Sequence, residues 1–430
     1  MNKEQIIELL QSWNFWSKEI NTGITRESYS ERIEKYVKTE QIIVISGIRR
    51  SGKSTIMKQF IKHNIQKGID KKNFLYLNLE EPQFTGLLSL DFLQQIYDAY
   101  REIIQPIGRY FILLDEIQRI KGWEKFARAL HEKKEAQIIV SGSNADLISK
   151  EFGTLLTGRW LEIKTYPLTF KEFLEFKQIS IKQRSEILLQ KIKIKQLLRE
   201  YLQFGGFPLV VLQREKEDIL KRYYDDIITK DIAERNNVRE IEKLRNLSKY
   251  YLTTISLFFS YRKLLPVIGV SLDTIERFSE YLSECYLLFY VRKFSYSLKE
   301  QEINQRKVYT IDPGIATMIS FSFSRNIGRI YENAVFIYLH QKQHEIYYYK
   351  TESYEIDFVI KQNTKIKYLI QVCYDLNVSE TKKREVTALI KASKELKCNN
   401  LIIITEDKEE EETIENRKIK YIPLWKWLLQ

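Results

Sequence analysis

The stretch Gly47-Ile48-Arg49-Arg50-Ser51-Gly52-Lys53-Ser54 matches the pattern G-x-x-x-x-G-K-S, which is typical of a phosphate-binding loop. The apolar run Ile42–Ile45 precedes it and predicts a buried strand, and Thr55–Ile61 follows it and predicts the first turns of a helix. Four fixed positions between a strand and a helix make a chance glycine-rich turn a poor alternative. The sequence therefore predicts a loop that binds the phosphates of a nucleoside triphosphate.

Each residue type in this loop suits phosphate binding for a physical reason. The glycines let the backbone curl, so that successive N–H groups point inward and the helix N-terminus adds partial positive charge. Lys53 can reach the β- and γ-phosphates, and the hydroxyl of Ser54 can ligate Mg²⁺. We expect the side chains of Arg49 and Arg50 to point outward, toward solvent or a partner. Thr55, the next residue, is also expected to contact the nucleotide.

A second apolar run carries the acidic residues that such a loop requires. Tyr110–Leu114 predicts a buried strand, and Asp115-Glu116 follows it directly, which is the Walker B pattern. Asp115 is expected to hold Mg²⁺ directly or through water, and Glu116 to orient and activate the attacking water. The pattern is weak alone, but its place about 60 residues after the loop makes it specific.

A third buried strand, Gln137–Val140, runs into Ser141-Gly142-Ser143-Asn144. Where an extra strand separates the loop strand from the Walker B strand, a polar residue here senses the γ-phosphate. Ser143 and Asn144 are the candidates, and the alternative is a capped turn that starts a helix over 145–149. Glu80, after a further strand, is expected to be a solvated loop residue, with contact to the metal's water shell as the alternative.

One arginine later in the chain is a candidate for stabilising transition-state charge. Arg159 directly precedes Trp160 and the predicted strand Leu161–Lys164. An arginine that reaches the γ-phosphate can come from the same chain or from a neighbouring one. The alternative is a surface arginine that packs on Trp160.

The size and composition of the chain limit the classes of protein to which it can belong. The 430 residues exceed one ordinary core, so we expect two to four domains. The net charge of +12 points weakly to a polyanionic partner, and a lysine-rich solvated surface explains it equally well. Three cysteines without a C-x-x-C pair indicate neither disulfides nor zinc and suit a reducing cytoplasm. Because no apolar run approaches about 20 residues, no membrane span is expected.

The middle of the chain has helical periodicity, interrupted at Gly205-Gly206-Phe207-Pro208. After it, 243–259 predicts a helix, and Ser271–Glu284 predicts a second one after a turn at Leu265–Gly269. A strand over Tyr286–Phe294 completes a winged-helix pattern. The second helix is net acidic, which argues against a DNA-reading role and for packing against protein.

Taken in order, these motifs resemble those of a known family. The runs VISGIRRSGKST, LLDEIQRIKGWE, VSGSN and LTGRW look like those of prokaryotic AAA-type ATPases that carry a C-terminal domain of unknown function related to PD-(D/E)XK nucleases. The resemblance continues through Tyr201–Pro208 and Tyr224–Ile228 and covers nearly the whole chain after residue 20 or so. It implies that the nucleotide is ATP, since no base-specificity motif is visible.

The resemblance implies an α/β fold class with several parts. These are an N-terminal helical segment (1–38), a P-loop ATPase core (39–176), a helical lid (177–240), a winged-helix-like middle (241–298) and a PD-(D/E)XK-like α/β domain (299–430).

The resemblance also implies a nuclease-type site with altered residues. The family pattern places a Glu on a helix, an Asp on a strand and an E-x-K pair on the next strand. Glu332 and Asp357 match it, but Gln371 and Cys373 stand where Glu and Lys are expected. Gln is a neutral, weaker Mg²⁺ ligand, and Cys carries no positive charge. Lys350 could replace the lysine only if the fold turns it inward, so we expect a retained fold without cleavage.

Three hypotheses for function follow. The first is a Mg²⁺-dependent ATPase whose nucleotide state repositions its C-terminal domains, with action on DNA left open. The second is an ATP-regulated switch or scaffold that hydrolyses slowly and grips a protein partner. The third is an ATP-dependent nuclease. The sequence specifies neither the partner nor the oligomeric state.

Overall fold

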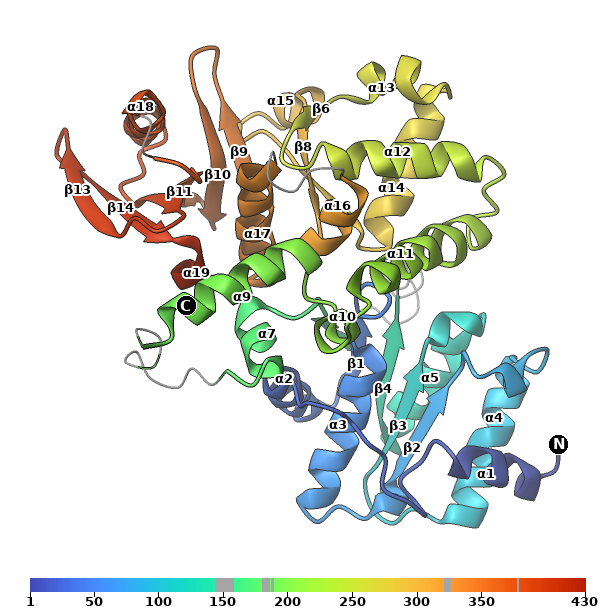
Figure 1. Ribbon diagram of the computed structural model, residues 1–430. Helices are drawn as coiled ribbons and strands as arrows, with labels where there is room; N and C mark the ends of the chain where they lie inside the picture. Colours follow the sequence, from blue (N-terminus) through green and yellow to red (C-terminus); the bar gives the residue numbers. More distant parts are fainter. Residues whose placement is uncertain (144–157, 180–185, 187–188, 321–325, 377–378) are drawn as a thin grey trace. The chain divides into compact units, whose positions relative to one another are not determined.

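The computed structural model describes residues 1–143, 158–179, 186, 189–320, 326–376 and 379–430 (Figure 1). These residues form two compact units, Met1–Thr165 and Tyr166–Gln430. Asn144 and the helix expected over 145–149 lie outside the described residues. In the described part of the chain, no helix is long and apolar enough to cross a membrane.

A parallel five-stranded sheet forms the centre of the first unit, in the order β2-β3-β4-β1-β5. The α/β core with an extra strand between the loop strand and the Walker B strand is therefore confirmed, because β4 lies between β1 and β3. Nearly every residue of β1 to β4 is buried, as expected for a sheet with helices on both faces, whereas the edge strand β5 is mostly half-buried. The strands are β1 (Ile42–Ser46), β2 (Phe74–Asn78), β3 (Tyr110–Asp115), β4 (Ala136–Gly142) and β5 (Trp160–Lys164).

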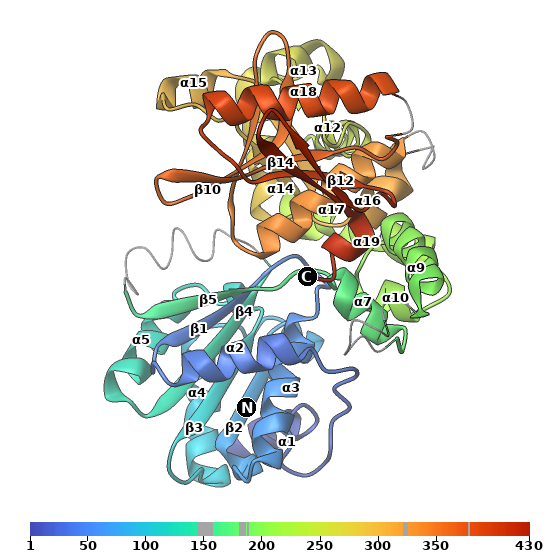
Figure 2. The same cartoon turned by 90° about the vertical axis from the view of Figure 1, so that its left-hand side faces the viewer.

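Helices cover the two faces of this sheet (Figure 2). On one face α2 (Glu27–Val37) and α3 (Lys53–Gln66) pack against alternate strand residues. On the other face α1 (Lys3–Gln11), α4 (Leu90–Ala99) and α5 (Trp123–Lys133) do the same. Short turns of 3₁₀- or π-helix complete the unit, over Lys71–Asn73, Pro82–Phe84, Tyr100–Ile104 and Ile117–Arg119.

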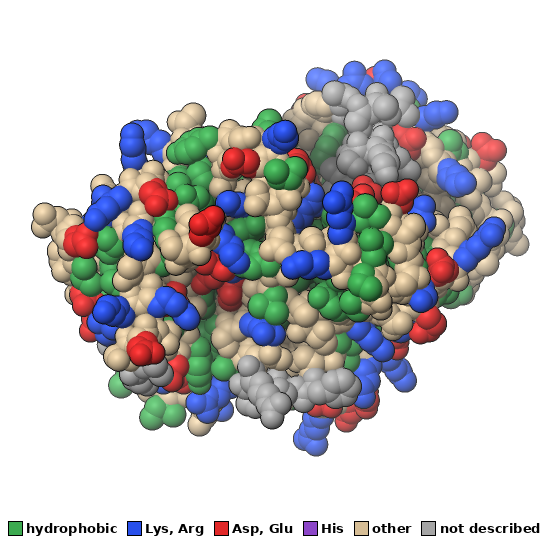
Figure 3. All heavy atoms as spheres, turned by 90° about the horizontal axis from the view of Figure 1, so that it is seen from above, with side chains coloured by type: hydrophobic (Ala, Val, Ile, Leu, Met, Phe, Trp, Pro, Cys, Tyr) green, Lys and Arg blue, Asp and Glu red, His purple; other side chains and the backbone are tan. Residues whose placement is uncertain are grey.

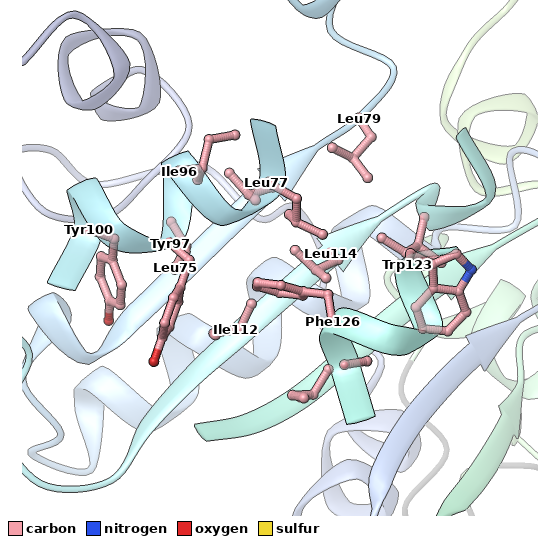
Figure 4. Close-up of a cluster of buried hydrophobic side chains, with 14 of the residues drawn as sticks. Leu75, Leu77, Leu79, Ile96, Tyr97, Tyr100, Ile112, Leu114, Trp123 and Phe126 are labelled. Atoms are coloured by element: carbon pink, nitrogen blue, oxygen red, sulfur yellow. The ribbon is translucent and has the colours of Figure 1, made fainter. Parts of the chain in front are cut away.

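Successive side chains of β2 point to opposite faces of the sheet, so some pack in the hydrophobic core and others lie near the phosphate-binding loop. Leu75 and Leu77 of β2 point into the cluster of α4 and α5, as Figure 4 shows. The side chain between them, Tyr76, therefore points to the opposite face, where α3 begins. A buried tyrosine is thus placed beside the phosphate-binding loop.

The second unit begins with helices that are joined to a later part of the chain through one buried carboxylate. Gly205 has φ +76°, and a Cβ there would lie 1.8 Å from Asp312 Oδ1, so only glycine fits. Asp312 Oδ2 accepts from Gly206 N at 2.7 Å, and burial raises the pKa of Asp312 to about 7. The elements are α7 (Phe170–Phe176), α9 (Lys191–Phe204), α10 (Pro208–Leu212), α11 (Lys216–Asp226), a π-helix (Ile227–Glu234) and α16 (Pro313–Ile319).

The middle of the second unit departs from the expected element limits. The helix expected over 243–259 ends at Thr253, because Phe258 pairs with Lys307 in a small antiparallel sheet of order β6-β8-β7. The expected turn 265–269 is instead the end of a further helix, which stops at Gly269 with φ +72°. The elements are α12 (Ile241–Thr253), β6 (Phe258–Phe259), α13 (Tyr261–Ile268), α14 (Leu272–Glu284), β7 (Leu288–Val291), α15 (Leu298–Ile303) and β8 (Arg306–Thr310).

A mixed six-stranded sheet of order β13-β14-β12-β11-β10-β9 ends the chain. Strands β11, β12 and β14 run parallel, and the remaining pairs are antiparallel. Helix α18 covers one face, and α17 packs against β8, β9 and β11. The elements are α17 (Ile327–Gln341), β9 (Glu345–Lys350), β10 (Glu355–Gln362), β11 (Lys365–Val372), α18 (Ser379–Glu395), β12 (Leu401–Thr405), β13 (Glu410–Ile414), β14 (Arg417–Pro423) and α19 (Leu424–Trp427).

Candidate functional site

The phosphate-binding loop connects β1 to α3, as the sequence predicts. Gly47 has φ +142°, and a Cβ there would lie 2.1 Å from the carbonyl oxygen of Thr165. Gly52 caps the helix in the left-handed region, with φ +102°. Both positions thus require glycine, because a side chain at the first would collide with backbone and at the second would strain it.

Lys53 is the first residue of α3, and its side chain is only 4% exposed. Its Nζ donates to the carbonyl oxygens of Gly47 at 3.0 Å and Ile48 at 3.3 Å, both in the loop itself. The same atom lies 3.6 Å from Glu116 Oε1. The predicted phosphate ligand and the predicted water-activating carboxylate are therefore neighbours.

Asp115, the last residue of β3, is fully buried and surrounded by hydroxyl groups. Tyr76 donates its phenolic proton to Asp115 Oδ2 at 2.7 Å, and Ser141 of β4 donates to Oδ1. Ser54 also hydrogen-bonds to this carboxylate. Burial and then the neighbouring Glu116 raise the pKa of Asp115, while the three hydroxyls oppose that rise.

Glu116 is held in a backbone conformation that few side chains adopt. Its φ is +57°, in the left-handed region. The backbone N–H of Glu116 donates to Ser141 Oγ at 3.1 Å, and the side chain of Gln118 donates to its carboxylate. Such a conformation costs of order 1–3 kcal/mol and is found preferentially at functional sites. Ser141 thus fixes both acidic residues of the pair.

Ser143 follows β4 and lies at the same sheet edge as the loop and Asp115. Its side chain is 1% exposed, and its Oγ has no hydrogen-bond partner among the described residues. A buried hydroxyl without a partner is unfavourable unless a ligand uses it. Of the two sensor candidates, Ser143 therefore has support from the structure, and Asn144 lies outside the described residues.

The two loop arginines differ from each other. Arg50 is exposed, as expected. Arg49 does not point freely to solvent or a partner: it is half-buried, and its Nη2 lies 2.8 Å from Glu80 Oε1. Arg119 reaches the same oxygen at 3.2 Å. Burial would raise the pKa of Glu80, but the two guanidinium groups outweigh it and lower the pKa. Glu80 is therefore an ion-pair partner rather than a solvated loop residue.

Four residues that sequence reasoning missed support the loop and Asp115. Tyr76 and Ser141 contact Asp115, and only their strand neighbourhood, not a motif, could have indicated this. Arg26 is 4% exposed, and its Nη1 donates to the carbonyl oxygen of Ser51 at 3.0 Å. Gln59 of α3 donates to the carbonyl of Thr22 at 2.9 Å, which ties the segment before α2 to the loop helix.

Arg159 does not reach the nucleotide site of its own chain. It precedes β5, which runs parallel to β1 with Ile42 opposite Trp160 and Ser46 opposite Lys164. Arg159 therefore lies at the edge where β1 begins, about 15 Å from the loop at roughly 3.3 Å per residue. Its Nη1 pairs with Glu132 Oε1 at 2.7 Å. Of the two sources left open for this arginine, the strand register argues against the same chain, because parallel strands place Arg159 and the loop at opposite edges of the sheet.

The residues at the loop fit a nucleotide with its divalent cation. A hydroxyl (Ser54) and a carboxylate (Asp115) are the hard oxygen ligands that Mg²⁺ prefers. The buried hydroxyl of Ser143, which has no hydrogen-bond partner among the described residues, lies at the same edge. The lysine that would contact phosphate is anchored to neutral carbonyls, which a phosphate can displace.

The second unit brings Glu332 and Asp357 together, as the nuclease-type pattern predicts, but with an unexpected partner. Lys307 of β8 is 2% exposed and projects between them. Its Nζ lies 3.0 Å from Glu332 Oε1, 3.0 Å from Asp357 Oδ1 and 2.6 Å from Glu355 Oε1. We call these four residues the Lys307 cluster. The positive charge beside Glu332 and Asp357 thus comes from a strand of the three-stranded sheet.

The substituted positions Gln371 and Cys373 have structural contacts. Gln371 Oε1 accepts from the backbone N–H of Asp357 at 2.7 Å, and its Nε2 donates to the carbonyl of Glu355 at 3.1 Å. Cys373 lies one residue beyond β11, where burial raises the pKa of its thiol to about 12. Lys350 is exposed at the end of β9, 3.9 Å from Glu355, so it does not turn inward. In the described residues, no group of three or more His, Cys, Asp or Glu could hold a metal ion.

The strand order, the loop and the buried acidic pair define a P-loop ATPase of the AAA type. Residues 39–174 match the family described as an AAA domain, and 195–325 and 327–427 match two domains of unknown function. An uncharacterized protein of Methanocaldococcus jannaschii is 36% identical over 407 residues, covering 90% of this chain and 88% of that protein. The chain belongs to the same family.

Two further proteins are similar over much of the chain. An uncharacterized protein of Haemophilus influenzae is 32% identical over 367 residues, covering 83% of this chain and 89% of that protein. Among solved structures, a Walker-type ATPase of Pyrococcus abyssi matches 69% of this chain and 95% of its own, at 16% identity and a TM-score of 0.40.

Proposed function

We propose that the protein is a Mg²⁺-dependent ATPase whose nucleotide state controls its second unit. The observation that carries the proposal is the convergence of Lys53, Asp115 and Glu116 at one sheet edge, with Lys53 Nζ 3.6 Å from Glu116. Ser54 and Asp115 would hold Mg²⁺, which would supply positive charge to offset the negative charge of the phosphates. The family assignment of residues 39–174 supports the same activity.

Each residue at this edge has a distinct task in the proposal. Lys53 leaves the loop carbonyls to contact phosphate, and Ser54 and Asp115 hold the cation. Glu116 orients the attacking water and accepts its proton. Ser143 donates its buried hydroxyl toward the γ-phosphate. Tyr76 and Ser141 are positioning residues, since they fix the acidic pair and contact no reacting atom.

Replacing the loop lysine tests the proposal. Lys53→Ala should lower ATP binding and turnover by about a hundredfold or more, since a charge-stabilising contact is lost. Lys62→Ala, an exposed lysine on the same helix, is the matched control and should leave both unchanged. Binding and turnover that survive in Lys53→Ala would show that the assigned site is wrong.

For the second unit we infer a helical lid, a winged-helix-like middle and a retained nuclease-type fold without cleavage. The order α12-β6-α13-α14-β7-α15-β8, with β6 and β7 both paired to β8, supports the winged-helix part. Exposed residues of α14 are Asp273, Glu276, Arg277 and Glu280, a net acidic set. On the face in Figure 3, Lys and Arg side chains are interspersed with Asp and Glu. Contact with protein therefore fits better than DNA reading.

A slow, switch-like turnover is the second candidate. The contacts of Glu116 with Lys53 and Gln118 favour it, because a carboxylate already bonded on both sides is less available to water. Measuring turnover with and without duplex DNA separates the candidates. Stimulation by DNA supports a DNA-coupled ATPase, whereas tight ATP binding with slow, DNA-indifferent turnover supports the switch. An intermolecular role for Arg159 remains part of either proposal and requires an oligomer.

A further inference from the structure

The Lys307 cluster lies in the second unit and takes no part in the ATPase site. Its lysine comes from the middle of β8, where Lys307 pairs with Phe258 on one side and Val291 on the other. Its Nζ also lies 5.2 Å from the ring centroid of Phe258. The backbone of Lys307 is thus fixed on both sides by sheet pairing, so its place among the carboxylates is built into the fold.

Two hydrogen bonds and an ion pair hold the ammonium among the acidic residues. Lys307 Nζ donates to Glu332 Oε1 and to Asp357 Oδ1, each at 3.0 Å, and it lies 2.6 Å from Glu355 Oε1. Tyr309 donates to the same Glu332 oxygen at 2.6 Å, and the backbone N–H of Val372 donates to Asp357 Oδ2 at 3.0 Å. Both oxygens of Asp357 are therefore engaged without any added ligand.

The charges of the cluster are also arranged around the ammonium. Burial and then Asp357 raise the pKa of Glu332 to about 8, with Lys307 opposing the rise. Burial would lower the pKa of Lys307, but Glu332 and Asp357 outweigh it and hold that pKa well above its usual value. The lysine thus stays charged. Its ammonium is a buried positive charge that faces the oxygens of three acidic residues.

A divalent cation does not fit this arrangement. Mg²⁺ and Mn²⁺ require carboxylate oxygens to converge at about 2.0–2.2 Å from one point, with the negative charge of those ligands unshared. Here the converging oxygens of three acidic residues point at the Lys307 ammonium instead. Glu and Lys placed at positions 371 and 373 would therefore not restore a metal centre while Lys307 stays.

We propose that the Lys307 ammonium is the resident cation of this carboxylate site, standing where a metal-dependent site holds a hard divalent ion. Its removal then creates a divalent-cation site formed by Glu332, Glu355 and Asp357. The wild-type cluster stabilises the second unit without metal. The ligand class that the altered site accepts is a hard divalent ion such as Mn²⁺, because all its ligands are carboxylates.

Mn²⁺ binding to nucleotide-free, full-length protein tests this proposal. Lys307→Met should gain one Mn²⁺ site that wild type lacks, seen by calorimetric titration, and Mn²⁺ should raise its thermal midpoint by several degrees. Adding Asp357→Asn to that variant should abolish the gain. Lys350→Met removes a nearby exposed lysine and should behave as wild type.

Two outcomes would overturn the proposal. One is a Lys307→Met protein that folds but gains no Mn²⁺ site. The other is a Mn²⁺ site in wild type that Asp357→Asn removes, since lysine and metal would then coexist. The second measurement needs no lysine variant, so the proposal stays testable even if Lys307→Met fails to fold. Any Mn²⁺ held at the P-loop is common to all variants and cancels in the comparison.

Discussion

The two units each bury a lysine among acidic residues, yet the two lysines are held in opposite ways. Lys53 rests on two neutral carbonyls of its own loop and lies 3.6 Å from a single carboxylate. Lys307 is bonded to three carboxylates at 2.6–3.0 Å. The first follows a glycine loop at a helix N-terminus, whereas the second lies within a sheet.

This difference indicates when a buried lysine can serve a ligand. Neutral carbonyls bind an ammonium less strongly than a phosphate does, so a nucleotide can take Lys53 from its loop. Three carboxylates around Lys307 already supply the anionic partners that a ligand would offer, and removing the lysine would leave them buried and unpaired. A buried lysine near acidic residues is thus able to bind a ligand in the first unit, whereas in the second unit it is already bound by the protein's own carboxylates.

Disrupting the Lys307 cluster should have the largest effect on the stability of the protein. Lys307→Met should lower the free energy of unfolding by about 3–5 kcal/mol, the usual cost of leaving a buried charge without its partner. Lys350→Met should change it by less than about 1 kcal/mol, since its pair with Glu355 is exposed. Denaturant unfolding of both variants measures the difference. Equal losses would mean that the Lys307 cluster has no special stabilising role.

A comparable effect, on turnover rather than on stability, is expected from Glu116→Gln at the loop. Removing the water-activating carboxylate should lower turnover by about 10²–10⁴-fold, which is the usual contribution of a general base. ATP binding should persist, because phosphate contacts are unchanged. Nucleotide binding and single-turnover hydrolysis, measured on the same protein, separate the two effects. Full turnover in the variant would remove Glu116 from its assigned role.

Tyr76→Phe should have a weaker and more specific effect. The lost hydrogen bond favoured the ionised form of Asp115, so the pKa of Asp115 should rise further. The acidic limb of the pH–turnover profile should therefore move to higher pH, and Mg²⁺ activation should weaken about tenfold, or ~1.4 kcal/mol. Tyr97→Phe makes the same change on the opposite sheet face and should leave both readouts unaltered.

The smallest effect is expected at Arg159. Its pair with Glu132 is exposed, so Arg159→Ala should leave the thermal midpoint nearly unchanged and ATP binding intact. Arg128→Ala removes the other arginine of Glu132 and is the matched control. Turnover measured across protein concentrations then tests the intermolecular role. A loss of ATP binding in Arg159→Ala alone would contradict the placement at the far sheet edge.

The ATPase core could be predicted from the sequence because its motifs are local. Gly47–Ser54 carries its own strand and helix signals, and Asp115-Glu116 follows a continuous apolar run, so each motif indicates its own backbone. The extra strand was predicted for the same reason. The role of Arg159 stayed open at that point, because the sequence does not tell which edge of a parallel sheet a residue occupies until the strand register is known.

The site in the second unit could be predicted only in part. Glu332 and Asp357 follow a known spacing, but Lys307 belongs to a different sheet and matches no motif. The contact of Tyr76 with Asp115 could not be predicted either, because Asp115 is on a neighbouring strand. Contacts that depend on strand pairing between distant segments leave no periodic signal in the chain. They emerge only when the sheets are assembled.

The bond between Gly206 and Asp312 has a consequence for the order of folding. It joins positions 106 residues apart, and closing a loop of that length costs about 4 kcal/mol of chain entropy. One hydrogen bond contributes at most about 3 kcal/mol, which is less than this entropy cost. The contact between Gly206 and Asp312 therefore requires the accompanying packing of α9 against α16. We therefore expect the helices and small sheet between these positions to form early, and the glycine pair to close against Asp312 late.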